Sequence, residues 1–301
     1  MMYAVLDIGS NTVRMLVGKC DAGRLHPVIR ERQITRLAGE STVETGLSAR
    51  AIHRTLAALA CFSIKLQQLN IPCLRAVATA AVRDAVNQND FIDQVRQQTG
   101  LDVEVIDGDE EARLTAAGVL SVVTPVPENA LIFDIGGGST ELILVSNGRI
   151  TAQKSYSVGV VRLCEGYKDK IERRQAIDAA LTDFGAMTRQ NNLTAGSFTV
   201  IGTAGTMTTL AAVDMGMTSY DAEKINNHQL SVQWLQELYQ RMESMTISER
   251  EQVPGMEQGR ADLILPGLQL AVAIAEAHGV ADLKVSDAGL LEGVLLAACH
   301  D

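Results

Sequence analysis

The stretch Leu6-Asp7-Ile8-Gly9-Ser10-Asn11-Thr12 returns later in the chain as Phe133-Asp134-Ile135-Gly136-Gly137-Gly138-Ser139-Thr140-Glu141. In each copy an apolar run of strand length ends in an aspartate, a glycine-containing turn follows, and a second apolar run leads away. We align the second runs, residues 13–17 and 142–145, with one residue of slack in the turn. A strand–turn–strand unit that occurs twice predicts two similar domains that face one cleft.

Helices and strands alternate around both copies, which indicates an α/β fold. Between the copies we expect a third strand after Gly23, a helix capped by Ser48, strands at 74–79 and 103–106, and helices at 90–98 and 109–119. After the second copy we expect strands following Gly148 and at 198–201 and 283–286. Helices are expected at 174–190, from Gly202 through Val213, and at 231–245, 259–277 and 288–298. Two prolines in 124–129 break helix and strand, so we place the domains at residues 1–123 and 124–287.

Composition excludes several classes of protein. The 301 residues carry 26 Lys+Arg against 36 Asp+Glu, a formal net charge of −10. This acidity, without a run of basic residues, argues against a nucleic-acid polymer as partner. The five cysteines are scattered and form no CxxC pair, so neither a disulfide framework nor a zinc knuckle is indicated. No signal-like segment opens the chain and no apolar run approaches the ~18 residues of a membrane span. We expect a globular cytoplasmic protein that binds no membrane; a homodimer is left open.

Three glycine-rich turns, at 7–12, 134–140 and 202–206, each follow an apolar strand. Glycine lets successive backbone N–H groups point at phosphate oxygens, and a helix that begins at such a turn offers further free N–H groups. The alternative for any single turn is that it only closes a hairpin. Three such turns in one chain favour phosphate binding.

Two of these turns are preceded by a carboxylate, Asp7 or Asp134, at the end of a strand expected to be buried. Packing does not favour a carboxylate there, and buried carboxylates normally have a partner or a metal ion. Together with Glu141 they are suited to Mg²⁺, which binds through one or two carboxylates, waters and substrate phosphates.

Two further segments carry charged residues at the ends of expected elements. Glu110 and Glu111 lie in the first turn of the helix at 109–119, where they could complement the helix dipole or supply a general base for an attacking water. Arg83 follows the strand at 74–79 and could be a solvated charge or a fork that grips phosphate oxygens. The same question applies to Arg14, Arg36, Arg162 and Arg260. Spacing alone does not decide between these alternatives.

Motifs of other hydrolases and nucleotide-binding proteins are missing from the sequence. The five histidines show no metal-binding spacing, and neither a Gly-x-Ser-x-Gly elbow nor a Gly-x4-Gly-Lys-Ser/Thr loop occurs. The sequence therefore does not favour a serine hydrolase or a P-loop NTPase.

Taken together, the motifs resemble those of the exopolyphosphatase / guanosine pentaphosphate phosphatase family. The resemblance rests on Asp-Ile-Gly-Ser-Asn-Thr-x-Arg at 7–14, Ala-Thr-Ala-x-x-Arg at 78–83, Glu-Glu-Ala-Arg at 110–113 and Asp-Ile-Gly-Gly-Gly-Ser-Thr-Glu at 134–141. It extends through Gly-Val-Val-Arg-Leu at 159–163, Gly-Thr-Ala-Gly-Thr at 202–206, Arg-Ala-Asp-x-Ile-x-Pro-Gly at 260–267 and Val-Ser-Asp-x-Gly-Leu at 285–290. These motifs span nearly the whole chain in order.

The resemblance implies the duplicated actin-like ATPase (ribonuclease H-like) fold, with an active site in the cleft between its two domains. It implies release of the terminal phosphate of polyphosphate or of the 5′ γ-phosphate of guanosine pentaphosphate. This reaction would depend on Mg²⁺, with Mn²⁺ as a possible substitute. Glu111 would activate the water, Arg83 would grip phosphate, and Asp134, Glu141 and Asp7 would orient metal and water. The phosphate-binding residues would be Ser10, Asn11, Gly136, Gly137, Gly138, Ser139, Gly205 and Thr206. The last helix, about 288–301, is expected to pack back on the first domain.

The chain departs from the family pattern at two places. Asn226-Asn227 stands where a histidine and a glycine are usual, with His228 directly after, and Leu291 replaces an arginine. Two other functions stay open: an ATP-dependent sugar or acetate kinase of the same fold, and a non-catalytic nucleotide sensor. The Asn11 turn and the Glu-Glu-Ala-Arg element favour water as the acceptor over a substrate hydroxyl.

Overall fold

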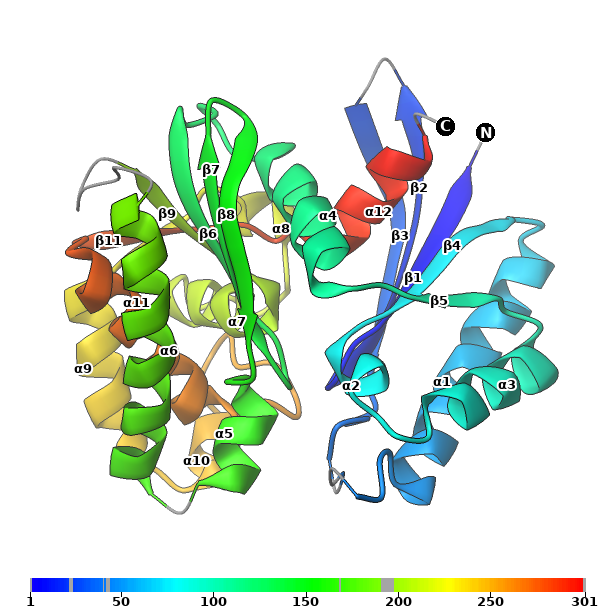
Figure 1. The fold of residues 1–301 in the computed structure, drawn as a ribbon, viewed down its shortest axis with the longest axis horizontal. Coiled ribbons are helices and arrows are strands. Elements are labelled where there is room, and N and C mark those ends of the chain that lie inside the picture. The colour runs from blue at the N-terminus through cyan, green and yellow to red at the C-terminus, as the bar shows by residue number, and fades with distance from the viewer. Residues whose placement is uncertain are drawn as a thin grey trace. The chain divides into compact units, whose positions relative to one another are not determined.

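A computed structural model describes residues 2–21, 24–39, 41, 44–167, 169–190 and 198–299. The chain divides into two units (Figure 1): unit 1 comprises Met1–Ser121 with Leu290–Asp301, and unit 2 comprises Val122–Gly289. The expected turn at Asp21-Ala22-Gly23 falls partly outside the described residues. Within the described part of the chain, none of the helices combines the length and the apolar composition that a membrane span needs.

Unit 1 contains a five-stranded mixed sheet in the order β3-β2-β1-β4-β5. Its strands are β1 (Tyr3–Ile8), β2 (Thr12–Asp21), β3 (Arg24–Ile34), β4 (Cys73–Ala78) and β5 (Val103–Val105). Its helices are α1 (Ala49–Gln68), α2 (Ala80–Arg83), α3 (Gln88–Thr99), α4 (Gly108–Leu120) and α12 (Leu290–Ala298). Because β1, β4 and β5 are parallel neighbours, their carboxyl ends meet at one edge of the sheet.

The two faces of this sheet pack into separate apolar cores. Alternate residues of β1 divide between them: Ala4, Leu6 and Ile8 join the core with α1 and α3, whereas Val5 joins the core with α4 and α12. Ser48 caps α1 as expected, since its Oγ accepts the N–H of Ala51 at 3.2 Å.

The helix α12 lies along α4 inside unit 1, although it follows unit 2 in the sequence (Figure 1). Its apolar residues Leu290, Leu291, Val294 and Leu295 are buried in the same core as Leu114. A Cβ atom on Gly293 would lie 1.8 Å from the carbonyl oxygen of Leu114, so the two helices approach as closely as only glycine allows. Leu291, which departs from the family pattern, is therefore an apolar packing residue.

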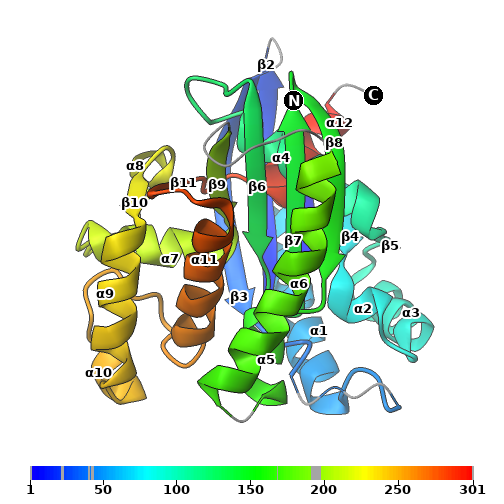
Figure 2. The same cartoon turned by 60° about the vertical axis from the view of Figure 1, so that its left-hand side comes forward.

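Unit 2 contains a six-stranded mixed sheet in the order β10-β11-β9-β6-β7-β8. Its strands are β6 (Asn129–Ile135), β7 (Thr140–Ser146), β8 (Arg149–Tyr156), β9 (Thr199–Thr203), β10 (Gln229–Ser231) and β11 (Asp282–Val285). Its helices are α5 (Val160–Gly166), α6 (Lys170–Gln190), α7 (Ala204–Asp214), α8 (Ala222–Ile225), α9 (Val232–Glu243), α10 (Ile247–Glu251) and α11 (Ile264–His278). Helix α11 packs between α6 and α9 (Figure 2), in a core that includes Leu131, Phe133 and Ile135 of β6.

The helix expected at 259–277 begins five residues later, at Ile264. Pro266 has no N–H and is tolerated only in the first turn of a helix, so the helix starts just before it. The preceding residues form turns instead, in which Arg260 N donates to Glu257 O at 3.1 Å and Leu263 N to Arg260 O at 2.9 Å. The last helix likewise begins two residues later than expected, at Leu290.

The two copies of the strand–turn–strand unit pair in the same register, without the slack that we expected. Asp7 pairs with Arg14 across β1 and β2, and Asp134 pairs with Glu141 across β6 and β7. Each turn is closed in the same way: Gly9 N donates to Thr12 O at 3.1 Å, and Gly136 N donates to Ser139 O at 3.0 Å. The slack in our sequence alignment comes from matching apolar residues. The buried Glu141 occupies the position that Arg14 has in the first copy, so the apolar run of the second strand is displaced.

Candidate active site

The turn at 9–12 in unit 1 is held by the loop that follows β3. Asn11 O accepts the N–H groups of Thr35 and Arg36, both at 2.9 Å, and Ser10 O accepts that of Ala38 at 2.8 Å. Within the described residues no hydrogen bond is found from the amide N–H of Ser10 or Asn11. Both side chains are buried. The carbonyl groups of the turn are thus engaged, and its N–H groups are available to an anion.

Asp7, at the end of β1, is only 1% exposed and forms an ion pair with Arg14. Arg14 donates from Nε at 2.8 Å and from its terminal nitrogen at 2.5 Å to the same carboxylate oxygen, Oδ2. The other oxygen, Oδ1, is buried and has no hydrogen-bond partner, and the same holds for Asn11 Oδ1. Unpaired buried oxygens are costly, so this turn fits a ligand or ion that would satisfy them.

The turn at 136–139 in unit 2 repeats this arrangement more fully. Its carbonyls are occupied by the start of α5, since Gly136 O accepts from Val160 N at 2.9 Å and Gly137 O accepts from Val161 N at 2.8 Å. Arg162 donates from Nε to Gly138 O at 3.0 Å. Among the described residues no acceptor is found for the amide N–H groups of residues 137–139. Three successive free donors form a concave site for phosphate oxygens.

Gly159 permits this close approach of α5 to the turn. A Cβ atom there would lie 2.4 Å from the carbonyl oxygen of Gly137 and 2.5 Å from its carbonyl carbon. The glycine of the Gly-Val-Val-Arg-Leu motif is therefore required by sterics, which the sequence alone did not explain.

Asp134 and Glu141 are neighbours on one face of the β6–β7 hairpin. Glu141 is 3% exposed, and its Oε1 accepts the Ser155 hydroxyl at 2.7 Å. Directly opposed carboxylates in a sheet repel each other unless a cation lies between them or nearby. In unit 1 the equivalent aspartate pairs with Arg14, whereas here the opposite position holds a second carboxylate. Two neighbouring carboxylates are ligands of the kind that Mg²⁺ prefers. No group of three or more His, Cys, Asp or Glu side chains suited to a metal is found in the described part of the chain.

Helix α7 begins at the third glycine turn with its first N–H groups uncapped. Its N-cap residue Thr203 makes no side-chain cap hydrogen bond and donates instead to Ala288 O at 2.9 Å. The guanidinium of Arg260 lies against Gly205, where a Cβ would be 1.8 Å from its terminal nitrogen, and Arg260 Nε donates to Glu257 at 2.5 Å. Thr206 is buried, and its side chain lies against Gly267.

Arg83 and Glu111 are brought together at the carboxyl edge of the unit 1 sheet. Arg83 closes α2, which follows β4, and Glu111 lies in the first turn of α4, which follows β5. The terminal nitrogen of Arg83 donates to Glu111 Oε2 at 2.9 Å and to Ile106 O at 3.0 Å. We expected Arg83 to grip phosphate; the structure gives it a carboxylate and a carbonyl as partners. Glu111 is 7% exposed and is held by this ion pair.

The departure at Asn226-Asn227 has a structural role within unit 2. Asn227, at φ 68°, donates from Nδ2 to Val122 O at 2.9 Å, and its Oδ1 accepts from Thr124 N at 2.8 Å. Asn226 Oδ1 accepts from Asp287 N at 2.8 Å. The asparagine pair therefore anchors the first and last segments of unit 2. His228 pairs with Asp214 at 2.7 Å.

Comparison with known proteins gives consistent results. The model of the Ppx/GppA phosphatase family matches residues 16–301. Exopolyphosphatase 2 of Mycobacterium tuberculosis is 33% identical over 320 residues, which cover 97% of each chain. The crystal structure of an exopolyphosphatase from Cytophaga hutchinsonii has a TM-score of 0.89 at 27% identity, covering 100% of this chain and 98% of that one.

A Ppx/GppA family member from Aquifex aeolicus has a TM-score of 0.77 at 28% identity, covering 99% of this chain and 97% of that chain. These likenesses establish the two-domain actin-like ATPase fold that the sequence motifs implied.

Proposed function

Because the chain belongs to the Ppx/GppA phosphatase family, we propose that it is an exopolyphosphatase, which hydrolyses the terminal phosphoanhydride bond of inorganic polyphosphate. The observation that supports this most directly is the turn at 136–139, whose carbonyls are all engaged while three successive N–H groups are left as donors. Such a turn recognises phosphate oxygens without regard to what the phosphate is attached to. The names of the curated relatives point to the same substrate.

In the proposed reaction Glu111 directs a water toward the terminal phosphorus. The water oxygen forms the new P–O bond, the anhydride P–O bond breaks, and the proton of the water passes to the Glu111 carboxylate. The shortened chain leaves as a phosphate anion. Arg83 holds the Glu111 carboxylate in place through its hydrogen bond to Oε2. Within its own unit, each glycine-containing turn would stabilise phosphate charge through backbone N–H groups, those of residues 137–139 in unit 2 and those of residues 10 and 11 in unit 1.

Mg²⁺ would be held by Asp134 and Glu141 of unit 2, and Mn²⁺ would serve in its place. In unit 1, Asp7 Oδ1 offers an oxygen donor of its own. When bound, the ion neutralises phosphate charge and orients the terminal group. Within unit 2, Ser155 fixes the Glu141 carboxylate by its hydrogen bond, and within unit 1 Arg14 fixes Asp7.

Guanosine pentaphosphate is a second proposed substrate, since its 5′ γ-phosphate ends in the same phosphoanhydride. The test is phosphate release from long polyphosphate, short polyphosphate, guanosine pentaphosphate and ATP, each with Mg²⁺ and with a chelator. We expect metal-dependent release from polyphosphate. Release only when a sugar acceptor consumes ATP would identify a kinase, and nucleotide binding without any release would identify a sensor.

Replacing Glu111 by Gln tests the proposed base. The substitution keeps the size of the side chain and one oxygen for Arg83 but removes the proton acceptor, so kcat should fall by about 10²- to 10⁴-fold with little change in KM. Thermal unfolding should be close to that of the wild type. A variant with the wild-type rate would remove Glu111 from the mechanism.

A further inference from the structure

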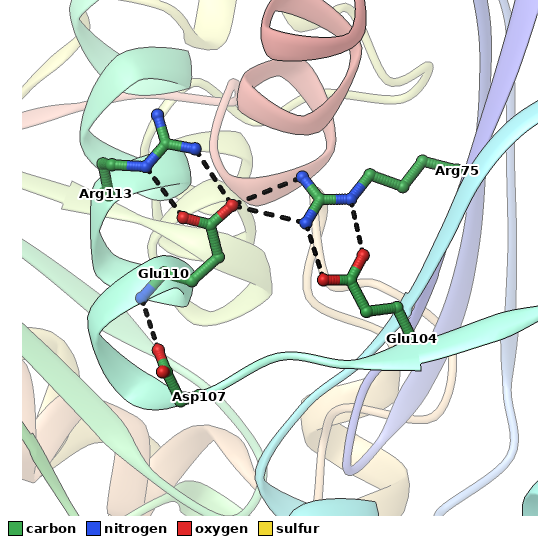
Figure 3. A network of polar contacts seen from close by, with 5 residues as sticks. All are labelled: Arg75, Glu104, Asp107, Glu110 and Arg113. Carbon is green, nitrogen blue, oxygen red and sulfur yellow. Dashed lines mark hydrogen bonds and ion pairs between the residues drawn. The ribbon is translucent and has the colours of Figure 1, made fainter.

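The first turn of α4 takes part in a charged network that does not include Glu111 itself (Figure 3). Glu110 accepts two hydrogen bonds from Arg113, at 2.8 and 2.9 Å, and two from Arg75, both at 3.3 Å. Arg75 in turn forks onto Glu104, at 2.9 and 3.0 Å. Asp107 caps the helix by accepting the N–H of Glu110 at 2.8 Å.

The members of this network come from three different elements. Arg75 belongs to β4, Glu104 to β5, and Glu110 and Arg113 to α4. Arg113 is on the same helix as Glu110, so this pair only stiffens the helix, whereas Arg75 connects the helix to the sheet. Hydrogen bonds from Arg113 lower the pKa of Glu110, and the hydrogen bonds that Arg75 donates to Glu104 raise the pKa of Arg75, so Glu110 and Arg75 are charged across the neutral range.

Glu111 lies next to Glu110 and is held from another direction. Its partner Arg83 comes from α2 and also binds Ile106 O, in the connection from β5 to α4. The first turn of α4 is thus tied to β4 and β5 through Arg75 and to α2 through Arg83. Two restraints from different elements fix both the position and the rotation of a helix end more tightly than one.

We infer that Arg75 is a positioning residue for Glu111: by tying Glu110 to the β4–β5 edge, it fixes the helix turn that aims the Glu111 carboxylate at the attacking water. This inference rests on the proposed role of Glu111 as the base. Arg75 touches neither substrate nor water in this scheme and acts only through the backbone of α4.

The charge of Arg75 offers a competing explanation, because a cation beside Glu110 also reduces the negative field at Glu111. Arg113 is the matched control for this effect. It neutralises the same carboxylate with shorter hydrogen bonds, and these bonds run within α4 instead of between α4 and the sheet. A role in charge alone predicts equal effects for the two arginines, whereas a role in positioning predicts that only Arg75 matters.

The experiment compares Arg75→Gln, Arg113→Gln and Glu111→Gln, and the double variant Arg75→Gln/Glu111→Gln, in steady-state hydrolysis of polyphosphate. A displacement of a reacting group by about 1 Å costs on the order of 100-fold in rate, so Arg75→Gln should lower kcat by roughly 10- to 100-fold. KM should stay within about twofold, because substrate contacts are not removed. Arg113→Gln should stay within about threefold of the wild type.

In the double variant, loss of Arg75 should cost nothing further, since there is no base left to position. Amide hydrogen exchange at residues 108–113 should become faster in Arg75→Gln and not in Arg113→Gln. If Arg75→Gln is too unstable to assay, Arg75→Lys serves instead: it keeps the charge, loses the fork, and should show the same loss of kcat in smaller degree.

Equal losses in Arg75→Gln and Arg113→Gln, or a further loss in the double variant, would overturn the inference while leaving Glu111 as the base. A fully active Glu111→Gln variant would overturn the proposed role of Glu111 as the base, and the inference with it, while polyphosphate hydrolysis itself would stand. An inactive Glu111→Gln variant beside a fully active Arg75→Gln variant would overturn the inference alone.

Discussion

Gly159 shows how a single residue determines whether a phosphate-binding turn can form. It lies where α5 delivers its first N–H groups to the carbonyls of Gly136 and Gly137, and only a hydrogen atom fits between the two backbones. The helix thereby holds the carbonyls on one side and leaves the N–H groups of the turn on the other. The anion site is thus a property of a contact between two segments.

Replacing Gly159 by Ala should therefore impair the proposed phosphate contacts. The added Cβ would lie 2.4 Å from Gly137 O, which forces α5 and the turn apart. We expect an increase in KM for polyphosphate of about tenfold or more, since binding to the turn weakens before chemistry begins. Steady-state kinetics measures the effect, and Gly166→Ala, where a Cβ meets no atom within 4 Å, is the matched control. Equal KM values in the two variants would contradict this account.

At this scale the sequence motifs located the candidate residues but not their partners. The glycine turns and the two strand-end aspartates could be found from the repeat, because glycine and a strand-end carboxylate have distinctive local signatures. The partners of Arg83 and the tie between Arg75 and Glu110 could not, since an arginine carries no local signal of which carboxylate it will contact across 28 or 35 residues.

At the scale of elements, α11 depends on a histidine that is kept neutral. His278 ends this helix with its ring between Phe184 and Phe198, at centroid distances of 6.3 and 5.8 Å, and its Nδ1 is 2.8 Å from Ile274 O. Burial lowers the pKa of His278 below its usual value near 6.5. The unfolded chain therefore binds more protons than the folded chain as the pH falls below that value.

The stability of unit 2 should accordingly decrease with acidification. The stability that the neutral, buried His278 contributes is fully present above the pKa of an unfolded histidine. This contribution is lost as the pH falls toward the lower pKa of the folded state. The midpoint of thermal unfolding, measured at pH 7.5 and pH 5.5, should fall more in the wild type than in a His278→Gln variant. The same decrease in both proteins would show that other groups carry the effect.

Element types were predicted well where one pattern extended over several turns or alternated along a strand, as in α1 and in β6. Boundaries failed where a tertiary contact or a proline decided them, as at the start of α11. The short helices α2 and α5 were missed because four and seven residues are too few to show a helical period.

At the scale of the whole molecule, α12 completes unit 1 from the far end of the described chain. Gly293 is its contact with α4, and an alanine there would place a methyl group 1.8 Å from Leu114 O. Since overpacking of this kind typically costs about 1–3 kcal/mol, Gly293→Ala should lower the free energy of unfolding of unit 1 by at least that amount.

Urea denaturation followed by hydrogen exchange resolves the two units in this variant. Protection should be lost at lower urea in β1, β2 and α4 than in β6 and β7. A uniform loss across both units, or none, would contradict the assignment of α12 to unit 1.

The placement of α12 in unit 1 also constrains the order in which the two units can fold during synthesis. Residues 290–299 are translated only after every residue of unit 2, so the nascent first unit emerges from the ribosome with the apolar side of α4 uncovered. Unit 2 has no such dependence and can finish folding first. The unit that is synthesised first is therefore the last to complete its folding. Until then Leu114 and Val5 form an exposed apolar surface that chaperones can bind.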